Sequence, residues 1–175
     1  MNNQLKIAVL GGGSWATAIV KMLCENIETV GWYMRSTYVA EHIKLNKHNP
    51  NYLSSAELHP NQLILSNNIN KTVEDYDILV FAIPSAFLTS ELGKLTTPLT
   101  NKVVFSAIKG IVPESGLIVG EHFFKNYNIP YKSIGVITGP CHAEEVAMER
   151  LSYLTIACQD QDQAKKVGEC LKSRY

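Results

Sequence analysis

The sequence predicts an α/β fold built on a doubly wound, mostly parallel sheet. Short apolar runs alternate with segments of helical periodicity along the chain, and this order of elements gives a parallel sheet covered by helices on both faces. The first apolar run also ends in three glycines, Gly11, Gly12 and Gly13, directly before a helical segment. There is no internal repeat or long linker, so we expect residues 1–175 to form one domain.

Composition and charge exclude several classes of protein. The 175 residues are 46% hydrophobic and 18% charged, which suffices for a globular core, and 16 basic residues balance 16 acidic ones. With zero net charge, the protein lacks the excess of basic residues that is typical of general nucleic-acid or anionic-membrane binders. The longest uncharged stretch, Ile7–Val20, is too short to span a bilayer, and no secretion signal is recognisable. We therefore expect no nucleic-acid partner, no membrane span and a cytoplasmic protein.

The cysteines and histidines predict neither a metal site nor a disulfide framework. Cys24, Cys141, Cys158 and Cys170 lie far apart without a CxxC pair, and the five histidines are equally scattered. Cys141 and His142 are neighbours, but adjacent side chains diverge and no further ligand or orienting group is evident. A metal centre and a cysteine–histidine nucleophile pair are both disfavoured.

The N-terminal elements are predicted to be strand, helix, strand and helix. Leu5–Leu10 is a continuous apolar run, typical of a strand buried on both faces. A helix with an apolar stripe follows, with Ser14 as its expected cap. Thr29–Met34 predicts a second strand and Ser36–Lys47 a partly exposed helix. His48–Asn61 is rich in Pro, Asn and Ser, which favours a long surface loop of the kind that is often functional.

The middle of the chain continues the alternation. A short strand is expected at Leu63–Leu65, and the most apolar run, Asp77–Ile83, predicts a strand at the centre of the sheet. A helix is expected over Pro84–Leu95. The strand Val103–Ile108 and the helix Ser115–Phe124 follow.

The C-terminal part adds two strands and a final helix. Ser133–Thr138 is an apolar strand, and Pro140 after it is expected in the first turn of a helix, where proline is tolerated best. Leu151–Ala157 predicts the last strand and Asp160–Lys172 an amphipathic helix. The chain then stops at Tyr175 without a breaker or tail, which predicts a cut and not a natural end.

The glycines carry the clearest chemistry. Gly11, Gly13 and Ala16 form a G-x-G-x-x-A pattern between the first strand and the first helix, where a dinucleotide pyrophosphate lies on helical N–H groups. Gly11 would permit the tight turn, Gly13 the approach of phosphate, and Ala16 the close packing of helix on strand. In this context the pattern predicts a Rossmann-like dinucleotide-binding domain.

The end of the second strand leaves the choice of cofactor open. An Asp or Glu about 20 residues after the glycines would bind the ribose hydroxyls of NAD, but Arg35 is the only charged residue between Gly31 and Tyr38. A planar guanidinium suits a ribose phosphate or stacking on adenine, although an exposed arginine is also an ordinary surface residue. The sequence therefore allows NADP, or NAD without a carboxylate anchor.

Two later strand ends bring further groups to the same edge of the sheet. Lys109 directly follows the strand Val103–Ile108, at the carboxyl edge where this architecture binds ligands. We expect it to meet an anion or a carbonyl, with an ordinary surface lysine as the alternative. Gly139 and Pro140 begin the next strand-to-helix junction, whose backbone can bind a phosphate or a carboxamide.

Together these motifs resemble those of NAD(P)-dependent glycerol-3-phosphate dehydrogenases. The resemblance covers essentially the whole chain and rests on Gly-Gly-Gly-Ser-Trp-Ala at 11–16, Arg35, Ala-Ile-Lys-Gly at 107–110 and Gly-Pro-Cys-His-Ala-Glu-Glu-Val-Ala at 139–147. Ser14 with Trp15 is far more specific than the glycines alone. The chain departs from the family pattern at Ala16, which replaces a glycine, and at Cys141, which replaces a hydroxyl residue and is a weaker hydrogen-bond donor.

The resemblance implies roles for individual residues. With the glycine motif, the positions expected to contact the cofactor, NAD or NADP, are Gly11, Gly13, Ser14, Trp15, Ala16, Arg35, Tyr52, Lys109 and Ala143. The positions expected to contact the phosphorylated triol are Lys109, Gly139 and Cys141. Lys109 would therefore bridge both ligands.

The resemblance also implies what lies beyond Tyr175. Family members continue into a mainly helical domain that carries the proton-transferring lysine, so we expect no catalytic residue within residues 1–175 and no complete catalysis by this chain alone. The implied reaction of the intact enzyme interconverts dihydroxyacetone phosphate and sn-glycerol 3-phosphate with NAD(P)H, which supplies phospholipid synthesis, and a homodimer is compatible with it. Another hydroxy-acid or sugar-acid dehydrogenase and a non-catalytic NAD(P)H sensor remain as alternatives.

Overall fold

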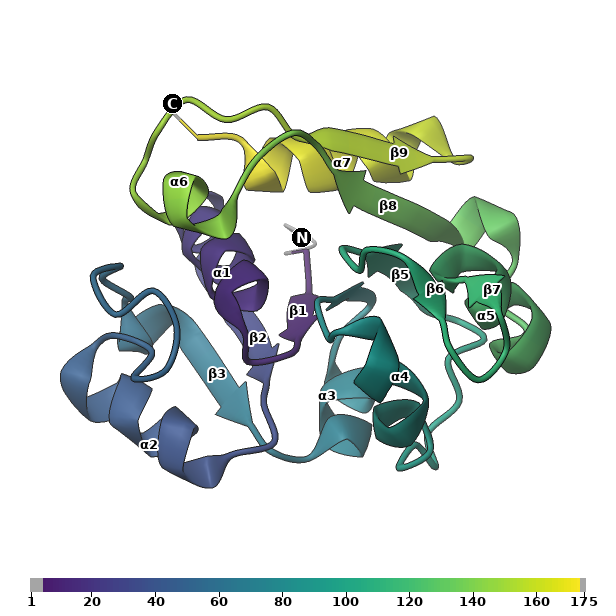
Figure 1. The fold of residues 1–175 in the computed structure, drawn as a ribbon, viewed down its shortest axis with the longest axis horizontal. Helices are drawn as coiled ribbons and strands as arrows, with labels where there is room; N and C mark the ends of the chain where they lie inside the picture. Colours follow the sequence, from purple (N-terminus) through teal and green to yellow (C-terminus); the bar gives the residue numbers. More distant parts are fainter. Residues whose placement is uncertain (1–4, 174–175) are drawn as a thin grey trace.

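The structure is a computed structural model that describes residues 5–173 as a central sheet between two layers of helices (Figure 1). The strands of the sheet are β1 (Ile7–Leu10), β2 (Val30–Tyr33), β3 (Leu63–Ser66), β4 (Ile78–Phe81), β5 (Val103–Ser106), β8 (Ile134–Thr138) and β9 (Thr155–Cys158). The helices are α1 (Ser14–Asn26), α2 (Thr37–Asn46), α3 (Ile69–Asp75), α4 (Ser85–Leu92), α5 (Val119–Tyr127), α6 (Ala143–Ala147) and α7 (Gln161–Leu171). A hairpin of β6 (Ile111–Val112) and β7 (Leu117–Ile118) and two 3-10 turns, Pro60–Gln62 and Tyr131–Ser133, complete the elements.

The strand order confirms the predicted fold class. Within residues 5–173 the main sheet has seven strands in the order β3-β2-β1-β4-β5-β8-β9. Neighbours pair in parallel except β8 and β9, which are antiparallel. This is a doubly wound, mostly parallel α/β sheet. The chain end at Tyr175 lies outside the described residues, so the expectation of a cut there stays a prediction.

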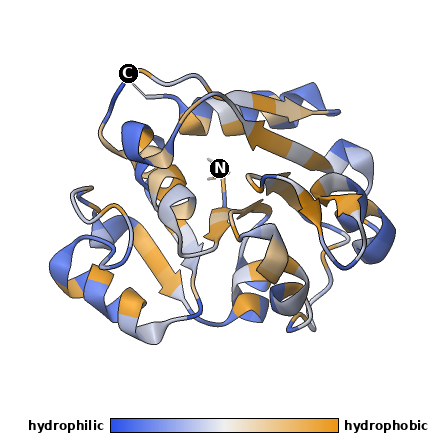
Figure 2. Cartoon of the chain, viewed as in Figure 1, coloured by the Kyte–Doolittle hydropathy of each residue, from blue (hydrophilic) through white to orange (hydrophobic). Residues whose placement is uncertain are grey.

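The central strands are buried because they are apolar on both faces. Every residue of β1, β2 and β4 is buried, as expected for strands covered by helices on both sides. Helices α1, α2, α6 and α7 contribute to one hydrophobic cluster, and α3, α4 and α5 to the other. Figure 2 shows the apolar residues gathered on the strands and hydrophilic ones on the outer faces of α2 and α5. Both faces of the sheet are therefore covered by packed helices. Ligands in this architecture bind at the carboxyl ends of the strands, where loops join the strands to the helices.

Two predictions about helix starts are wrong. Ser14 is the first residue of α1, and the residue before it, Gly13, makes no side-chain cap. Pro140 lies outside the first turn of α6, because that helix begins three residues later at Ala143, with His142 as its N-cap. Helix α1 therefore begins one residue earlier than the sequence suggested, whereas the junction between β8 and α6 is longer than expected.

Two elements of the middle region also differ from expectation. The helix expected from Ser115 begins only at Val119, because Ile111–Ile118 folds back as the β6–β7 hairpin. Helix α3 was not expected from the pattern, and its N-terminus is capped by Asn68, whose side chain accepts a hydrogen bond from the N–H of Lys71 at 3.1 Å. A seven-residue helix is too short for its periodicity to be recognised.

Two glycines offer a matched test of the packing. A Cβ on Gly31 in β2 would overlap the ring of the buried Tyr76, whereas a Cβ on Gly168 in α7 would have the Ile156 side chain 3.9 Å away. Gly31→Ala should destabilise the fold by about 1–3 kcal/mol through overpacking. Gly168→Ala should stabilise it by about 0.5–1 kcal/mol, because alanine favours a helix interior. Urea unfolding followed by circular dichroism measures both, and equal midpoints for the two variants would contradict the packing described.

Candidate functional site

The sheet reverses its direction of growth at β1. This strand lies between β2 and β4, and the chain returns from β3 at the edge to β4 on the other side. Open α/β sheets bind ligands outside the carboxyl ends of their strands at such a point. Gly11–Gly13 follows β1 and Ala82–Pro84 follows β4 at this edge.

Gly11 is confined between the two neighbouring strands. Its φ is +134°, and a Cβ here would collide with the carbonyl oxygen of Ala82. Its N–H donates to the Tyr33 carbonyl at 3.0 Å, and its own carbonyl accepts from Nε1 of Trp32 at 2.7 Å. Gly13 differs, because a Cβ placed on it meets nothing within 4 Å. The turn is thus closed on its inner side and open on its outer side.

The N-terminus of α1 faces this open side. Gly13 provides no side-chain cap, and the first turn holds no acidic residue. The first intrahelical bond runs from the Thr17 N–H to the Gly13 carbonyl at 3.0 Å. Uncapped N–H groups and the positive helix end favour a bound anion. Ala16 is fully buried, so it packs α1 against the sheet and does not line the open side.

Asn49 supports the glycine turn and was missed by sequence reasoning. It is fully buried, and its Nδ2 donates to the Gly12 carbonyl at 3.2 Å and to Oγ1 of Thr17 at 2.9 Å. That hydroxyl donates in turn to the Gly13 carbonyl at 3.0 Å. In the sequence, Asn49 is marked only by its place in the loop His48–Asn61, which was predicted to be functional. A single asparagine in a loop belongs to no motif that would indicate its partners.

A cleft of about 280 Å³ passes the end of β2, and we call it the β2 cleft. Four of the positions predicted to contact the cofactor line it: Gly11, Gly13, Arg35 and Tyr52. The Arg35 guanidinium lies over the ring of Phe87, 5.6 Å from its centroid. The other face of such a guanidinium can stack on a further planar group, such as a purine base.

A larger groove of about 830 Å³ adjoins it, and we call it the β5 groove. The predicted site residues that line it are Gly13, Ser14, Trp15, Tyr52, Lys109, Gly139, Cys141 and Ala143. Because Gly13 and Tyr52 line both hollows, the two form one continuous surface over the strand ends. Apart from the buried Ala16, the structure therefore brings all predicted site residues to one edge of the sheet.

Lys109 and Cys141 both line the β5 groove. Lys109 is exposed at the end of β5, and Cys141 is only 8% exposed. Burial raises the pKa of the Cys141 thiol, and the positive charge of Lys109 lowers it by less. Cys141 is thus a neutral thiol and a weak hydrogen-bond donor. Gly139 beside them has a φ of +152°, and a Cβ there would collide with the Tyr153 carbonyl.

Other kinds of site find no support in the part of the chain that the structure describes. Across residues 5–173 no group of three or more His, Cys, Asp or Glu side chains is placed to hold a metal ion. No helix in the same range is long and apolar enough to cross a membrane. All four cysteines are unpaired and buried.

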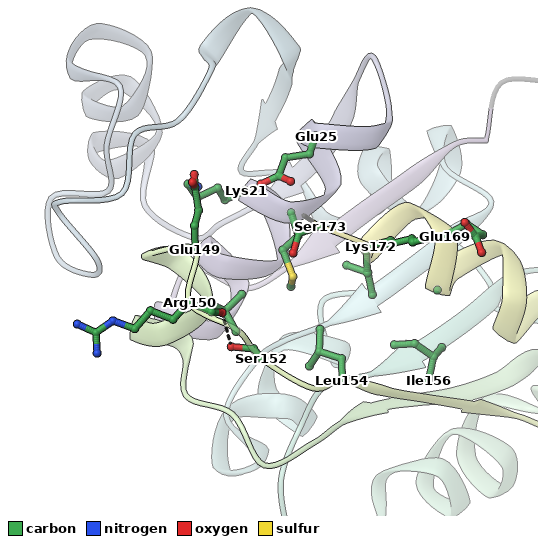
Figure 3. A pocket seen from close by; sticks show the side chains of 14 residues that line it. Lys21, Glu25, Glu149, Arg150, Ser152, Leu154, Ile156, Glu169, Lys172 and Ser173 are labelled. Atoms are coloured by element: carbon green, nitrogen blue, oxygen red, sulfur yellow. Dashed lines mark hydrogen bonds and ion pairs between the residues drawn. The ribbon is translucent and has the colours of Figure 1, made fainter. Parts of the chain in front are cut away.

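A separate hollow of about 320 Å³ lies between α1, α7 and the segment after α6 (Figure 3). Lys21 of α1 and Glu149 point toward one another and form an ion pair, which lowers the pKa of the Glu149 carboxyl. Arg150 points away from the hollow (Figure 3). None of the predicted site residues lines it, so it is not part of the surface described above.

Comparison with known proteins identifies the family of this chain. The family described as NAD-dependent glycerol-3-phosphate dehydrogenase N-terminus matches residues 6–164. This chain belongs to that family. Glycerol-3-phosphate dehydrogenases named as NAD(P)+ enzymes, from Pseudomonas fluorescens and Pseudomonas aeruginosa, are each 34% identical to it over 174 residues. These alignments cover 99% of this chain and 50% of each relative, so the chain spans about half the length of the curated relatives it matches.

Solved structures of the glycerol-3-phosphate dehydrogenase family share its fold. The enzyme of Plasmodium falciparum superposes with a TM-score of 0.87 at 25% identity, over 98% of this chain and 51% of that one. The enzyme of Saccharomyces cerevisiae gives a TM-score of 0.81 at 25% identity, over 99% and 55%. An imine reductase from Myxococcus stipitatus, at 14% identity and a TM-score of 0.65, shares the fold alone. The family resemblance and the fold class predicted from the sequence are confirmed.

Asn49→Ala tests the support of the glycine turn. The substitution leaves the carbonyl of Gly12 and the buried hydroxyl of Thr17 each without one partner, so it should cost about 1–3 kcal/mol of unfolding free energy. Asn51→Ala, two residues on at an exposed position, should stay within about 0.5 kcal/mol of the unaltered chain. Chemical denaturation measures both, and amide exchange at Gly12 and Gly13 should accelerate in Asn49→Ala only. Equal stability of the two variants would show that Asn49 does not hold the turn.

Proposed function

We propose that this chain is the cofactor-binding half of a glycerol-3-phosphate dehydrogenase and binds NAD or NADP along the β2 cleft and the β5 groove. The observation that carries the proposal is the open glycine turn before an uncapped α1, at the point where the sheet reverses. That turn fits a pyrophosphate, because Gly13 leaves room for it and the helix end is positive. When bound, the nicotinamide supplies the hydride chemistry, and the protein orients it.

The residues predicted to bind the cofactor fall into three groups, one for each part of the dinucleotide. Gly11 and Gly13 with the first turn of α1 would hold the pyrophosphate, and Ala16 would keep that helix close to the sheet. Arg35 and Tyr52 would hold the adenosine side. Ser14, Trp15, Lys109 and Ala143 line the β5 groove and would hold the nicotinamide side.

The phosphorylated triol would meet the far end of the β5 groove. Lys109 provides a positive charge there, Cys141 a neutral thiol, and Gly139 a backbone without a side chain of its own. Lys109 is the charged group best placed to balance a phosphate or polarise a carbonyl. We assign it contacts with both cofactor and substrate.

The complete reaction belongs to a longer protein in this proposal. Residues 1–175 form the dinucleotide-binding domain, and a helical domain after them carries the proton-transferring lysine. That protein interconverts dihydroxyacetone phosphate and sn-glycerol 3-phosphate for phospholipid synthesis in the cytoplasm, with a homodimer as its expected form. Support comes from the family match together with the half-length coverage of the relatives.

Calorimetry on the 175-residue chain tests cofactor binding. NADH or NADPH should bind with heat of binding detectable at millimolar concentrations, because the pyrophosphate turn is complete in this chain. Circular dichroism on the same sample controls for folding. A folded chain that binds neither cofactor would refute a competent dinucleotide site.

Lys109→Ala tests the role of the ammonium at the end of β5. Removing it should weaken NADH binding about tenfold, as for loss of one charge-assisted hydrogen bond. In a protein of the relatives' length it should also raise KM for dihydroxyacetone phosphate. Lys125→Ala is the matched control, because Lys125 is an exposed lysine on α5 outside both hollows. If Lys109→Ala left affinity, rate and KM at the control's values, the assignment would be wrong.

A further inference from the structure

A carboxylate reaches the β2 cleft from a helix far along the chain. Glu91 lies on α4, 58 residues after Tyr33, and its side chain is only 3% exposed although it lines the cleft with Arg35. We infer that Glu91 is a positioning residue that offsets the charge of Arg35 and thereby makes the cleft select NAD(H) over NADP(H). The inference rests on the proposed function, because it concerns the adenosine end of the same site.

The Glu91 carboxylate contacts three side chains, those of Tyr33, Lys94 and Arg35. Its Oε2 accepts a hydrogen bond from the Tyr33 hydroxyl at 2.7 Å. Its Oε1 accepts from Nζ of Lys94 at 2.8 Å and lies 3.7 Å from a terminal nitrogen of Arg35. Burial and the bond to Glu91 raise the pKa of Tyr33, so the phenol stays a neutral donor. One carboxylate oxygen is therefore shared between two cations, one of which faces the cleft.

Helix α4 holds Arg35 from two positions one turn apart. Phe87 lies under the guanidinium, and Glu91, four residues on, lies beside it. Residues at this spacing share a helix face. The arginine thus lies against a helix face that also carries a negative charge.

The charge balance of the cleft decides between the two cofactors. Arg35 and Glu91 are the two residues with formal charges among those lining the β2 cleft. Glu91 also pairs with Lys94, which does not line the cleft, so it offsets the charge of Arg35 in part. A ribose 2′-phosphate brings about −1.5 to −2, and the attraction of Arg35 for it is opposed by a carboxylate that water screens poorly. A ribose hydroxyl meets no such opposition. The arrangement therefore disfavours the phosphorylated cofactor.

A purely structural role for Glu91 predicts something different. If Glu91 only tied Tyr33 and Lys94 together, removing its charge would weaken or spare both cofactors equally. The ratio of the two dissociation constants separates these cases, because a common loss of folding cancels in it.

The test uses the 175-residue chain and two pairs of ligands at fixed ionic strength. NADPH is compared with NADH, and adenosine 2′,5′-bisphosphate with adenosine 5′-monophosphate, which differ only in the 2′-phosphate. The unaltered chain should bind the member without the 2′-phosphate more tightly in each pair. Glu91→Gln, which keeps an acceptor for Tyr33, should shift both ratios about fivefold toward the 2′-phosphate.

Glu41→Gln is the matched control. Glu41 pairs with Lys44 three residues on at 2.8 Å, as Glu91 does with Lys94, but it lies outside the β2 cleft. The control should leave both ratios unchanged. Arg35→Ala combined with Glu91→Gln should abolish the shift, because Glu91 acts through that guanidinium.

Lys94→Ala decides the matter if Glu91→Gln does not fold. The Lys94 side chain is half exposed, and its loss frees the carboxylate to act on Arg35 alone, so the ratios should move about twofold toward NADH. Retained binding with unmoved ratios in the folded variants, or a preference of the unaltered chain for NADPH, would overturn the inference. Absence of binding by the unaltered chain would instead refute the proposed function.

Discussion

The site depends on the close contact between Gly11 and the backbone of Ala82. This contact lets β1 and β4 stay adjacent up to the point where the chain turns into α1. Any side chain at position 11 would force the two strands apart, and the left-handed φ would add strain. The hydrogen bonds from Trp32 and to Tyr33 then fix the turn to β2 as well. The N-terminus of α1 is aimed by three strands together, which is why its direction does not rely on a side-chain cap.

In the proposed assignment, an anionic ligand is attracted by a few local positive groups and not by the net charge of the chain. The chain as a whole is neutral, yet the strand ends carry an uncapped helix start, Arg35 and Lys109 at separate places along one surface. Each is a positive centre spaced for a different part of a long anionic ligand, in the proposed assignment. The partial cancellation of Arg35 by Glu91 means that the adenosine end is the least positive of the three. Binding strength would then come mainly from the pyrophosphate turn, and selectivity from the ends.

Much of the fold, and the gathering of the candidate site residues at one edge of the sheet, could be predicted because the deciding signals are local. The apolar run of β1, the glycines and the periodicity of α1 are consecutive in the sequence, and the strand ends at Lys109 and Gly139 follow from the same alternation. The helix start at Val119 could not be predicted, because pairing of β6 with β7 overrides the local helical preference there. Asn49 and Glu91 were missed for a related reason. Each reaches the site from an element whose own pattern says nothing about the partner it meets.

Glu91 shows why a motif defined by sequence spacing can misjudge a cofactor site. The usual acid stands at the end of β2, about 20 residues after the glycines, and its absence here leaves NADP and NAD equally open on sequence grounds. In three dimensions α4 lies beside that strand end, because Tyr33, the last residue of β2, donates a hydrogen bond to Glu91 of α4. A carboxylate from α4 therefore acts on the same space that an acid on β2 would occupy. What matters for selectivity is the charge that faces the ribose, and the topology of the sheet allows two different elements to provide it.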